Sequence, residues 1–390
     1  MHNLICRKMT CPACNKPFEH YSAGSNGYQL IRRDTDNCPY YEGVNPLFYL
    51  ICVCPSCYFA ASVEDFKLAD KHRAAVKDAL TADPLASGID FQRPERSLFT
   101  ALRSYQLASL CCQAKGGPHH TAGSLALRAA WICRYGGQMG RELKFIEQAL
   151  VHYKEALRLG WTTDKDVTEL STAYLVGEMH FRSGQLAEAY EAFKLFLAKS
   201  SDPQLRAAAE GKLSRCQQAT KIRAFLERLP IFAKLSNHGL DLLSVNIEAR
   251  AYLPGSTICA KGEKVESMFV VTHGEVLVYV DDPAKPVSTL GEGSAFGEMS
   301  LLTGEPRSAA VLAGDHATDR SQGAVVLLEI GRTAFRNILQ VEPTVTAEIA
   351  SIVAKYKHDD ESRAIETATF LKQMQGFLGL EDEAETIAAT

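Results

Sequence analysis

The segment that most constrains the fold lies at residues 296–311 and reads FGEMSLLTGEPRSAAV. Gly297 permits a close approach of the backbone, and Glu298 offers a carboxylate that can accept two hydroxyl hydrogen bonds. The residues that follow can form one short helical turn whose free N–H groups face an anion. Arg307 supplies a planar fork of donors for an oxyanion, and Ser308 adds a hydroxyl. This segment therefore predicts a tight loop that binds hydroxyl groups at one end and an anion at the other.

A carboxylate and a guanidinium in one compact loop match the two ends of a cyclic ribose phosphate. The segment resembles the phosphate-binding cassette of cyclic-nucleotide-binding domains, the family of catabolite activator proteins, kinase regulatory subunits and gated channels. The likeness continues on both sides of the cassette, in stretches similar to the family's entry helix, first turns, paired strands and closing strand: residues 225–236, 252–255, 261–263, 268–276 and 324–330. The resemblance implies a jelly-roll-like β-roll with flanking helices over residues 221–357.

The resemblance also assigns roles within the cassette. It implies that Glu298 binds the ribose and that Arg307 binds the phosphate. The other implied nucleotide contacts are Phe296, Gly297, Met299, Ser308 and Ala309. Threonine often follows the arginine in cGMP-selective members, so Ser308 favours cAMP over cGMP as the ligand. In the alternative, a degenerate roll with an empty pocket, Glu298 and Arg307 would pair with each other.

The family caps the base of the nucleotide with the last helix of the domain. Pro343 suits the first turn of that helix, and Tyr356 is a candidate for stacking on the base. Residues 358–390 carry one amphipathic stretch, which we expect to dock on the body of the protein or on a second subunit, as in a homodimer. Because this tail is too short for a winged helix-turn-helix, we expect no DNA-binding domain. Residues 314–323 are expected only to enlarge a hairpin.

Two Cys-x-x-Cys motifs dominate the N-terminal region. Their cysteines are Cys11, Cys14, Cys54 and Cys57. Each motif can turn two thiolates toward one point, and together they complete a tetrahedral four-sulfur shell that suits zinc. Such a closed shell is structural rather than catalytic. The alternative is four unliganded thiols with redox activity. We interpret Cys6, Cys38 and Cys52 as packing residues, each an alternative ligand if the fold differs.

Residues 34–36, 39–41 and 45–49, with the second cysteine motif, resemble a bacterial family of unknown function. That family joins a paired-knuckle module to helical repeats, and the resemblance covers about residues 9–200. It implies an architecture and no activity, and it departs at Tyr58, where the family often has glycine. Residues 45–53 are predicted to form the strand that leads into the second motif. We interpret Asp34 and Asp36 as turn and cap residues, with functional carboxylates as the alternative.

Helical spacing and small residues mark the central region. The pattern Gly177, Gly184, Ala189 and Phe193 matches a tetratricopeptide repeat, and Gly137, Ala149, Tyr153 and Ala156 form an earlier, imperfect copy. Such repeats present a concave face to a protein partner. A plain helical bundle is the alternative. A further helix is predicted at residues 97–114. We interpret His119 and His120 as surface residues, because no carboxylate at metal-binding spacing accompanies them in the sequence.

Composition sets the remaining expectations. The 12 cysteines in a chain that begins without a secretory leader point to a reducing compartment, where cysteines are metal ligands or small buried side chains. The net charge of −4 gives no reason to expect a nucleic-acid or anionic-membrane partner. No apolar run approaches the roughly 20 residues that a membrane helix needs. We therefore expect a cytoplasmic protein.

These patterns predict a multidomain α+β protein with four parts: a zinc-ribbon-like module at 1–66, tetratricopeptide-like helices at 67–220, a cyclic-nucleotide-binding domain at 221–357 and a helical tail at 358–390. We expect a cyclic-nucleotide sensor, with cAMP as the favoured ligand, that couples binding to contact with a protein partner through its repeats. The alternative is a zinc-stabilised scaffold whose degenerate fold binds no nucleotide. No nucleophile–base pair, open metal site or Walker-type loop indicates an enzyme, so we expect none.

Overall fold

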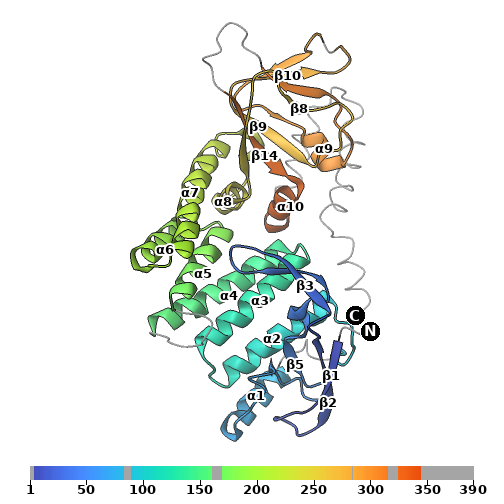
Figure 1. The fold of residues 1–390 in the computed structure, drawn as a ribbon, viewed down its shortest axis with the longest axis vertical. Coiled ribbons are helices and arrows are strands. Elements are labelled where there is room, and N and C mark those ends of the chain that lie inside the picture. The colour runs from blue at the N-terminus through green and yellow to red at the C-terminus, as the bar shows by residue number, and fades with distance from the viewer. Residues whose placement is uncertain (1–3, 83–88, 160–168, 283, 315–323, 344–390) are drawn as a thin grey trace. The chain divides into compact units, whose positions relative to one another are not determined.

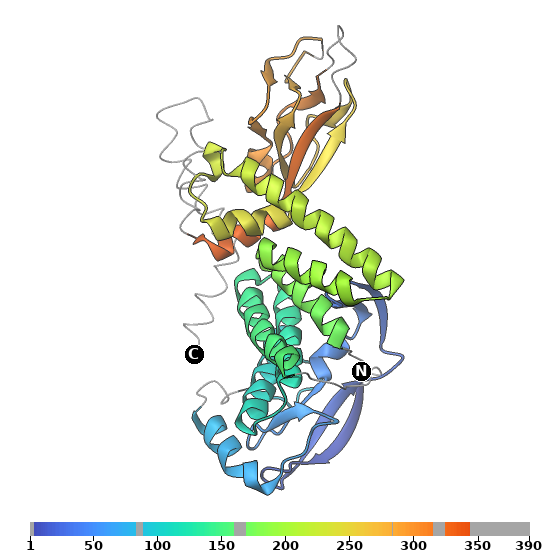
Figure 2. The same ribbon diagram turned by 90° about the vertical axis from the view of Figure 1, so that its left-hand side faces the viewer.

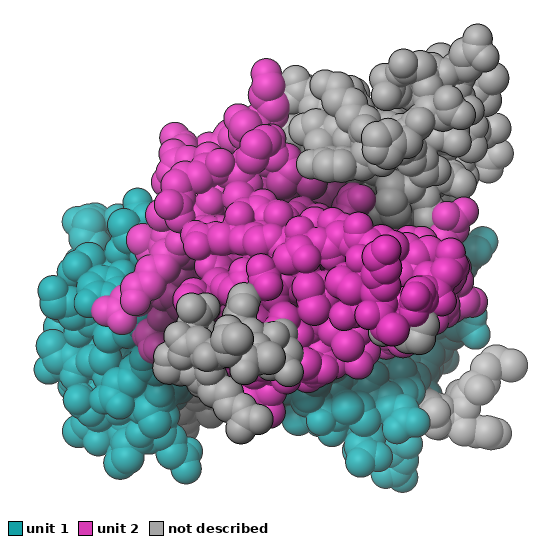
Figure 3. All heavy atoms as spheres, turned by 90° about the horizontal axis from the view of Figure 1, so that it is seen from above, with its two compact units in different colours: residues 1–213 teal, residues 214–390 magenta. Residues whose placement is uncertain are grey.

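The computed structural model describes residues 4–82, 89–159, 169–282, 284–314 and 324–343 (Figure 1). The chain divides into two compact units, Met1–Leu213 and Ser214–Thr390, which Figure 3 colours separately. Among the described helices, none is both long and apolar enough to cross a membrane.

Three antiparallel hairpins begin the first unit, each made of two strands that are neighbours in sequence. They are β1 (Leu4–Thr10) with β2 (Pro17–Ala23), β3 (Tyr28–Arg33) with β4 (Pro39–Gly43), and β5 (Ile51–Val53) with β6 (Ala60–Ser62). The strand predicted at residues 45–53 is wrong over its first part, because Pro46–Tyr49 forms a 3-10 helix, η1. Asn45 caps this turn by accepting a hydrogen bond from the Leu47 N–H at 3.0 Å, and proline follows at the first position.

The α-helices that follow the hairpins in the described residues are α1 (Asp70–Ala82), α2 (Leu98–Ala114), α3 (His119–Tyr135), α4 (Met139–Arg158), α5 (Glu169–Arg182), α6 (Leu186–Lys199) and α7 (Pro203–Leu226). The helix predicted at residues 97–114 is confirmed as α2, where the hydroxyl of Ser97 accepts from the Thr100 N–H at 3.1 Å. Helices α3 and α4 form one helical hairpin, and α5 and α6 form the next (Figures 1 and 2).

Small residues let the helices of each hairpin approach closely. A Cβ atom added at Gly177 would lie 2.8 Å from the ring of Phe193, and one at Gly123 would lie 3.1 Å from the ring of Tyr153. Gly184, with φ of +75°, makes the turn between α5 and α6. Gly177, Phe193 and Tyr153 of the repeat pattern therefore lie at contacts between paired helices, whereas Gly137 and Gly184 lie in the turns. This packing fits a plain helical bundle as well as a repeat.

The hairpins and the helices of the first unit share one hydrophobic core. Its buried side chains include Phe18, Val53 and Phe59 from the hairpins and Leu107 and Ile146 from the helices. Burial of apolar surface at this shared core stabilises both parts at once. Loss of order in the hairpins is therefore expected to weaken the helical part as well.

Where the structure describes the second unit, it contains two antiparallel four-stranded sheets, with orders β11-β10-β13-β8 and β12-β9-β14-β7. The strands are β7 (Glu248–Tyr252), β8 (Thr257–Cys259), β9 (Ser267–His273), β10 (Val276–Tyr279), β11 (Ser288–Leu290), β12 (Ala295–Phe296), β13 (Ala310–Ala313) and β14 (Val325–Gly331). Buried residues of both sheets form one core, for example Val276 and Val311 from the first and Val271 and Leu327 from the second. The protein is thus a mixed helix-and-sheet structure with a C-terminal β-sandwich.

Short helices accompany the sandwich: η3 (Pro230–Phe232), α8 (Asn237–Val245), α9 (Glu298–Thr303) and α10 (Arg332–Val341). The carboxylate of Glu342 accepts hydrogen bonds from the N–H and the hydroxyl of Ser236, which caps α8. The end of α10 is thereby joined to the start of α8. The predicted base-capping Tyr356, the tail at 358–390 and residues 315–323 of the predicted enlarged hairpin lie outside the described residues.

Candidate functional site

The cassette at residues 296–311 folds as the predicted tight loop. Strand β12 ends at Phe296, Gly297 turns the chain with φ of +80°, and α9 begins at Glu298. Gly304, with φ of +72°, ends α9. A Cβ atom at Gly297 would lie 1.9 Å from Nη1 of Arg307, so the glycine is required by both its backbone angle and its neighbour.

Arg307 lies inside this loop, with only 4% of its surface exposed. Its Nη1 donates to the carbonyl of Gly297 at 2.8 Å and its Nη2 to the carbonyl of Ser267, at the start of β9, at 2.5 Å. Its backbone N–H donates to the Glu263 carbonyl at 2.9 Å, which fixes the base of the side chain. Its Nε is buried and has no hydrogen-bond partner among the described residues. The guanidinium is thus held rigidly while part of its donor capacity stays unused.

Glu298 is half-buried on the first turn of α9. Burial raises the pKa of its carboxyl group, against the opposing effects of its own backbone N–H and of Arg307. In the described part of the chain, Glu298 and Arg307 form no ion pair, because the guanidinium donates to the two carbonyls instead. The pairing that a degenerate, empty roll requires is therefore absent from this geometry.

The remaining predicted contacts surround the same loop. The rings of Phe296 and Phe269 are stacked, with centroids 5.3 Å apart, and the Arg307 guanidinium lies 5.7 Å from the Phe269 centroid. Ser308 is exposed and Ala309 is half-buried, just before β13. The side chain of Met299 lies outside the described residues. The sequence did not predict that the Ser267 carbonyl accepts a hydrogen bond from Arg307, because any residue type can supply a backbone acceptor.

The four cysteines of the two motifs converge, as predicted from their pattern. The first motif occupies the turn between β1 and β2, and the second occupies the turn between β5 and β6. In each turn, the residue after the second cysteine donates its N–H to the carbonyl of the first cysteine at 2.8 Å. Those residues, Asn15 and Tyr58, have φ of 58° and 60°. The two turns are therefore copies of one local structure, and Tyr58 holds a left-handed conformation that glycine adopts more readily.

The sulfur atoms have the spacing of a metal shell. Cys11 Sγ lies 3.5 Å from Cys57 Sγ, Cys14 Sγ lies 3.7 Å from Cys54 Sγ, and all four lie within 4.8 Å of one another. A tetrahedral zinc site with Zn–S bonds of about 2.3 Å has sulfur–sulfur edges of about 3.8 Å. The residues therefore fit a four-thiolate metal site. The alternative ligands Cys6, Cys38 and Cys52 lie outside this group.

Asp34 and Asp36 belong to a buried ionic cluster rather than to an open site. The guanidinium of Arg134, on α3, bonds Asp34 at 2.8 Å, Asp36 at 2.6 Å and Glu142 at 2.8 Å. The Trp131 indole N–H also donates to Asp36 at 3.1 Å. Burial would raise the pKa of Asp36, but the bonds and charge of Arg134 outweigh it and hold this pKa below its usual value. Both aspartates therefore fix their loop on the helices, in addition to the predicted turn role of Asp36, which accepts from the Cys38 N–H.

Two family models match the chain. Residues 4–214 match the family described as "Uncharacterized protein conserved in bacteria (DUF2225)". Residues 249–342 match the model described as "Cyclic nucleotide-binding domain". The cassette around Glu298 and Arg307 lies within this second match.

Curated relatives resemble only part of the chain. A cAMP-dependent protein kinase regulatory subunit from Colletotrichum orbiculare is 26% identical over 191 residues, which cover 47% of this chain and 45% of that protein. A cyclic nucleotide-gated potassium channel from Rhizobium etli is 39% identical over 121 residues, 31% of this chain and 31% of that protein. The chain thus spans less than half the length of these relatives.

Solved structures give similar partial matches. The regulatory domain of Toxoplasma gondii PKA with cAMP matches with a TM-score of 0.29 and 19% identity, over 35% of this chain and 51% of that chain. The N-terminal domain of a transcriptional regulator from Streptomyces coelicolor A3(2) matches with a TM-score of 0.29 and 26% identity, over 34% of this chain and 91% of that chain.

Proposed function

Since the chain belongs to the DUF2225 family and its residues 249–342 form a cyclic nucleotide-binding domain, we propose that the protein is a sensor of a 3′,5′-cyclic nucleotide. The observation that carries this proposal is the guanidinium of Arg307, which is buried and whose hydrogen bonds go to two neutral carbonyls. A buried charge that makes no direct ion pair is costly. A phosphate anion beside Arg307 would offset that cost, so the site favours an anionic ligand.

Each end of the ligand has a partner in the cassette. The unused Nε–H of Arg307 is a donor for a phosphate oxygen, next to the backbone N–H groups that begin α9. Glu298, one position after the left-handed Gly297, can accept the ribose hydroxyl. Phe296, Met299, Ser308 and Ala309 complete the proposed contacts. The ligand we propose is cAMP rather than cGMP, because Ser308 stands where cGMP-selective relatives often have threonine.

We further propose that the four-cysteine group holds a structural zinc ion. Thiolates are the ligands that zinc prefers in closed sites, and four of them leave no position for a substrate. The shell would be supplied by Cys11, Cys14, Cys54 and Cys57, which close the β1–β2 and β5–β6 hairpins. Zinc would therefore stabilise the hairpins and, through the shared core, the helices.

The output of the sensor is proposed to be a protein contact made by the helical hairpins. This proposal rests on their resemblance to tetratricopeptide repeats and on the general rule that a ligand shifts a pre-existing equilibrium between two conformations. The division into parts at 1–66, 67–220, 221–357 and 358–390 stays a prediction. So do the absence of enzymatic activity, the cytoplasmic location and the homodimer.

The test is a calorimetric titration of the full chain with cAMP, cGMP and 5′-AMP. We expect saturable binding of cAMP, weaker binding of cGMP, and a smaller difference between them in Ser308→Thr. Glu298→Ala is expected to erase the preference for cAMP over its 2′-deoxyribose analogue. If no cyclic nucleotide binds at millimolar concentration, the sensor proposal fails and the zinc-stabilised scaffold takes its place.

A further inference from the structure

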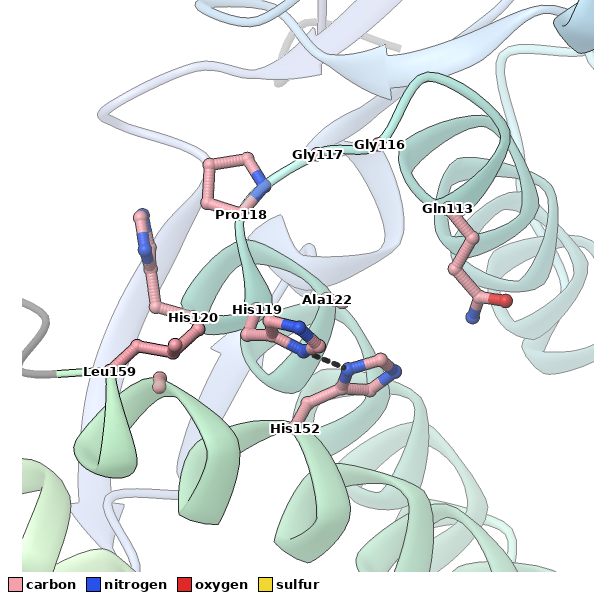
Figure 4. A pocket seen from close by; sticks show the side chains of 10 residues that line it. Gln113, Gly116, Gly117, Pro118, His119, His120, Ala122, His152 and Leu159 are labelled. Carbon is pink, nitrogen blue, oxygen red and sulfur yellow. Dashed lines mark hydrogen bonds between the residues drawn. The ribbon is translucent and has the colours of Figure 1, made fainter.

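A cavity of about 560 Å³ opens in the first unit where α3 begins and α4 ends (Figure 4). Small and apolar residues line much of it, including Gly117, Pro118, Ala122, Ala156 and Leu159. Its polar side chains are those of Gln113 and of three histidines, His119, His120 and His152. This cavity lies apart from the four cysteines and outside the nucleotide-binding domain.

Two of the histidines contact each other in the wall of the cavity. Nδ1 of His119, at the start of α3, lies 3.1 Å from Nδ1 of His152 on α4, and the ring centroids are 5.3 Å apart (Figure 4). Only one of these two nitrogens can carry a proton in such a contact, so at least one presents its lone pair to the other ring. His120 points away from the pair in Figure 4.

The separation of the two nitrogens suits a metal ion. Metal–imidazole bonds are about 2.0–2.1 Å long, so two nitrogens 3.1 Å apart subtend an angle of roughly 100° at a shared ion. That angle lies between the right angle of an octahedral site and the tetrahedral angle. Imidazole suits zinc, copper and nickel, and each tolerates this geometry.

A carboxylate lies one helical turn after His152. Glu155 follows His152 by three residues on α4, so the two side chains lie on one face of the helix. Its carboxylate now pairs with Arg158 at 2.6 Å, a contact between partly exposed side chains that contributes little stability. Release from Arg158 would let Glu155 turn toward the histidines.

We propose that His119 and His152 form a binding site for a divalent transition-metal ion, with Glu155 as a third ligand and water completing the shell. The ion replaces the hydrogen bond between the two Nδ1 atoms, whose proton moves through water to Nε2 of the same ring, and it joins the start of α3 to the last turns of α4. The open cavity leaves room for the water ligands. Sequence reasoning missed this site because His152 lies far from His119 along the chain and carries no motif.

Nickel is the probe that separates this site from the cysteines. One equivalent of zinc is first added to the full chain, which fills the closed four-thiolate site and leaves none for the histidines, and Ni²⁺ is then titrated in a calorimeter. We expect one Ni²⁺ bound per chain and a rise in the thermal unfolding midpoint, because an ion that binds only the folded state stabilises it.

Single substitutions assign the ligands. Outer-shell partners of metal-bound histidines are worth about 10- to 100-fold in affinity, so losing a ligand should cost about 100-fold or more. We expect this loss in His119→Ala and in His152→Ala, a smaller loss in Glu155→Gln, and none in the matched control His120→Ala. His119→Gln and His152→Gln, which keep a polar side chain of similar size, should behave like the alanine variants and unfold like the wild type without Ni²⁺.

Three results would overturn the proposal. One is zinc-loaded wild-type protein that binds no Ni²⁺. Another is Ni²⁺ binding that survives in the His119→Gln/His152→Gln double variant or is lost equally in His120→Ala. The third is binding of inorganic phosphate instead of Ni²⁺, which would make the cavity an anion site.

Discussion

The cysteine group and the nucleotide cassette differ in how far apart their parts lie along the chain. Each pair of cysteines is presented by one hairpin turn, and the two turns repeat the same hydrogen bonds. Arg307, in the loop before β13, instead depends on the carbonyl of Ser267, which lies on β9 and 40 residues away. A metal shell can thus be assembled from two short local structures, whereas the nucleotide site requires the whole sandwich to be folded.

The largest expected effect comes from breaking the metal shell. Cys54→Ser should release the metal and destabilise the first unit by several kcal/mol, because metal binding in such a module is folding free energy, about 10–16 kcal/mol in zinc-finger peptides. Elemental analysis and thermal unfolding of the intact chain measure both effects. Cys6→Ser, an exposed cysteine outside the group, is the matched control and should keep the metal. Wild-type protein that contains neither zinc nor iron would rule out the metal site.

The next effect tests whether the hairpins depend on the helices as well as on the metal. Arg134→Met leaves Asp36 buried without its cation, whereas Asp34 keeps Arg32 and Glu142 keeps Arg182. Removing one partner of a buried ion pair costs about 3–5 kcal/mol. Chemical denaturation should show this loss in the first unit while cAMP affinity stays unchanged. A stability equal to that of the wild type would mean that the cluster does not hold the hairpins to α3.

A smaller effect concerns pH and the first unit alone. His20 on β2 is buried with no partner for either ring nitrogen among the described residues, and burial, together with Arg96 and Arg7, lowers its pKa from 6.5 to about 4. The unfolded chain therefore binds a proton first, and the stability that the neutral ring contributes is present above pH 6.5 and lost as the pH falls toward 4. Between pH 7 and 5 the loss is about 2 kcal/mol.

The variant His20→Leu separates the effect of His20 protonation on stability from a second effect of low pH, the release of metal by protonated thiols. The second effect occurs in both the variant and the wild type. Denaturation curves at pH 7 and pH 5 should show a smaller fall in stability for the variant than for the wild type. Equal falls would show that His20 is protonated in the folded state at the same pH as in the unfolded chain.

The sequence predicted most completely what short motifs encode. In the four cysteines and in the loop from Gly297 to Arg307, the chemistry of each residue can be inferred from its type and spacing. Both segments have the local structure that the sequence predicted. The β-sandwich followed from a resemblance rather than from periodicity. The prediction of a strand at 45–53 was wrong at η1. There the Asn45 cap and the proline after it favour a helical turn more than the following aromatic residues favour a strand.

Long-range partners could not be predicted. Arg134 and His152 carry no motif, and their roles appear only when helices place them opposite Asp36 and His119. The carbonyls that hold Arg307 belong to the backbone and leave no trace in the sequence. The partners of a side chain can be predicted from sequence spacing when they are local. Partners that are distant in the sequence can be identified only from the structure.

The most direct test of the account is the cAMP affinity of Arg307→Ala in the full chain. The substitution leaves the phosphate without its buried cation, and losing one partner of such a pair costs about 2–5 kcal/mol, which is roughly thirtyfold or more in affinity. Arg307→Lys should rescue only part of it, because an ammonium keeps the charge and loses the fork. Arg250→Ala, which removes a surface arginine paired with Glu329, should bind like the wild type. Undiminished cAMP binding by Arg307→Ala would contradict the assignment of the phosphate to this cassette.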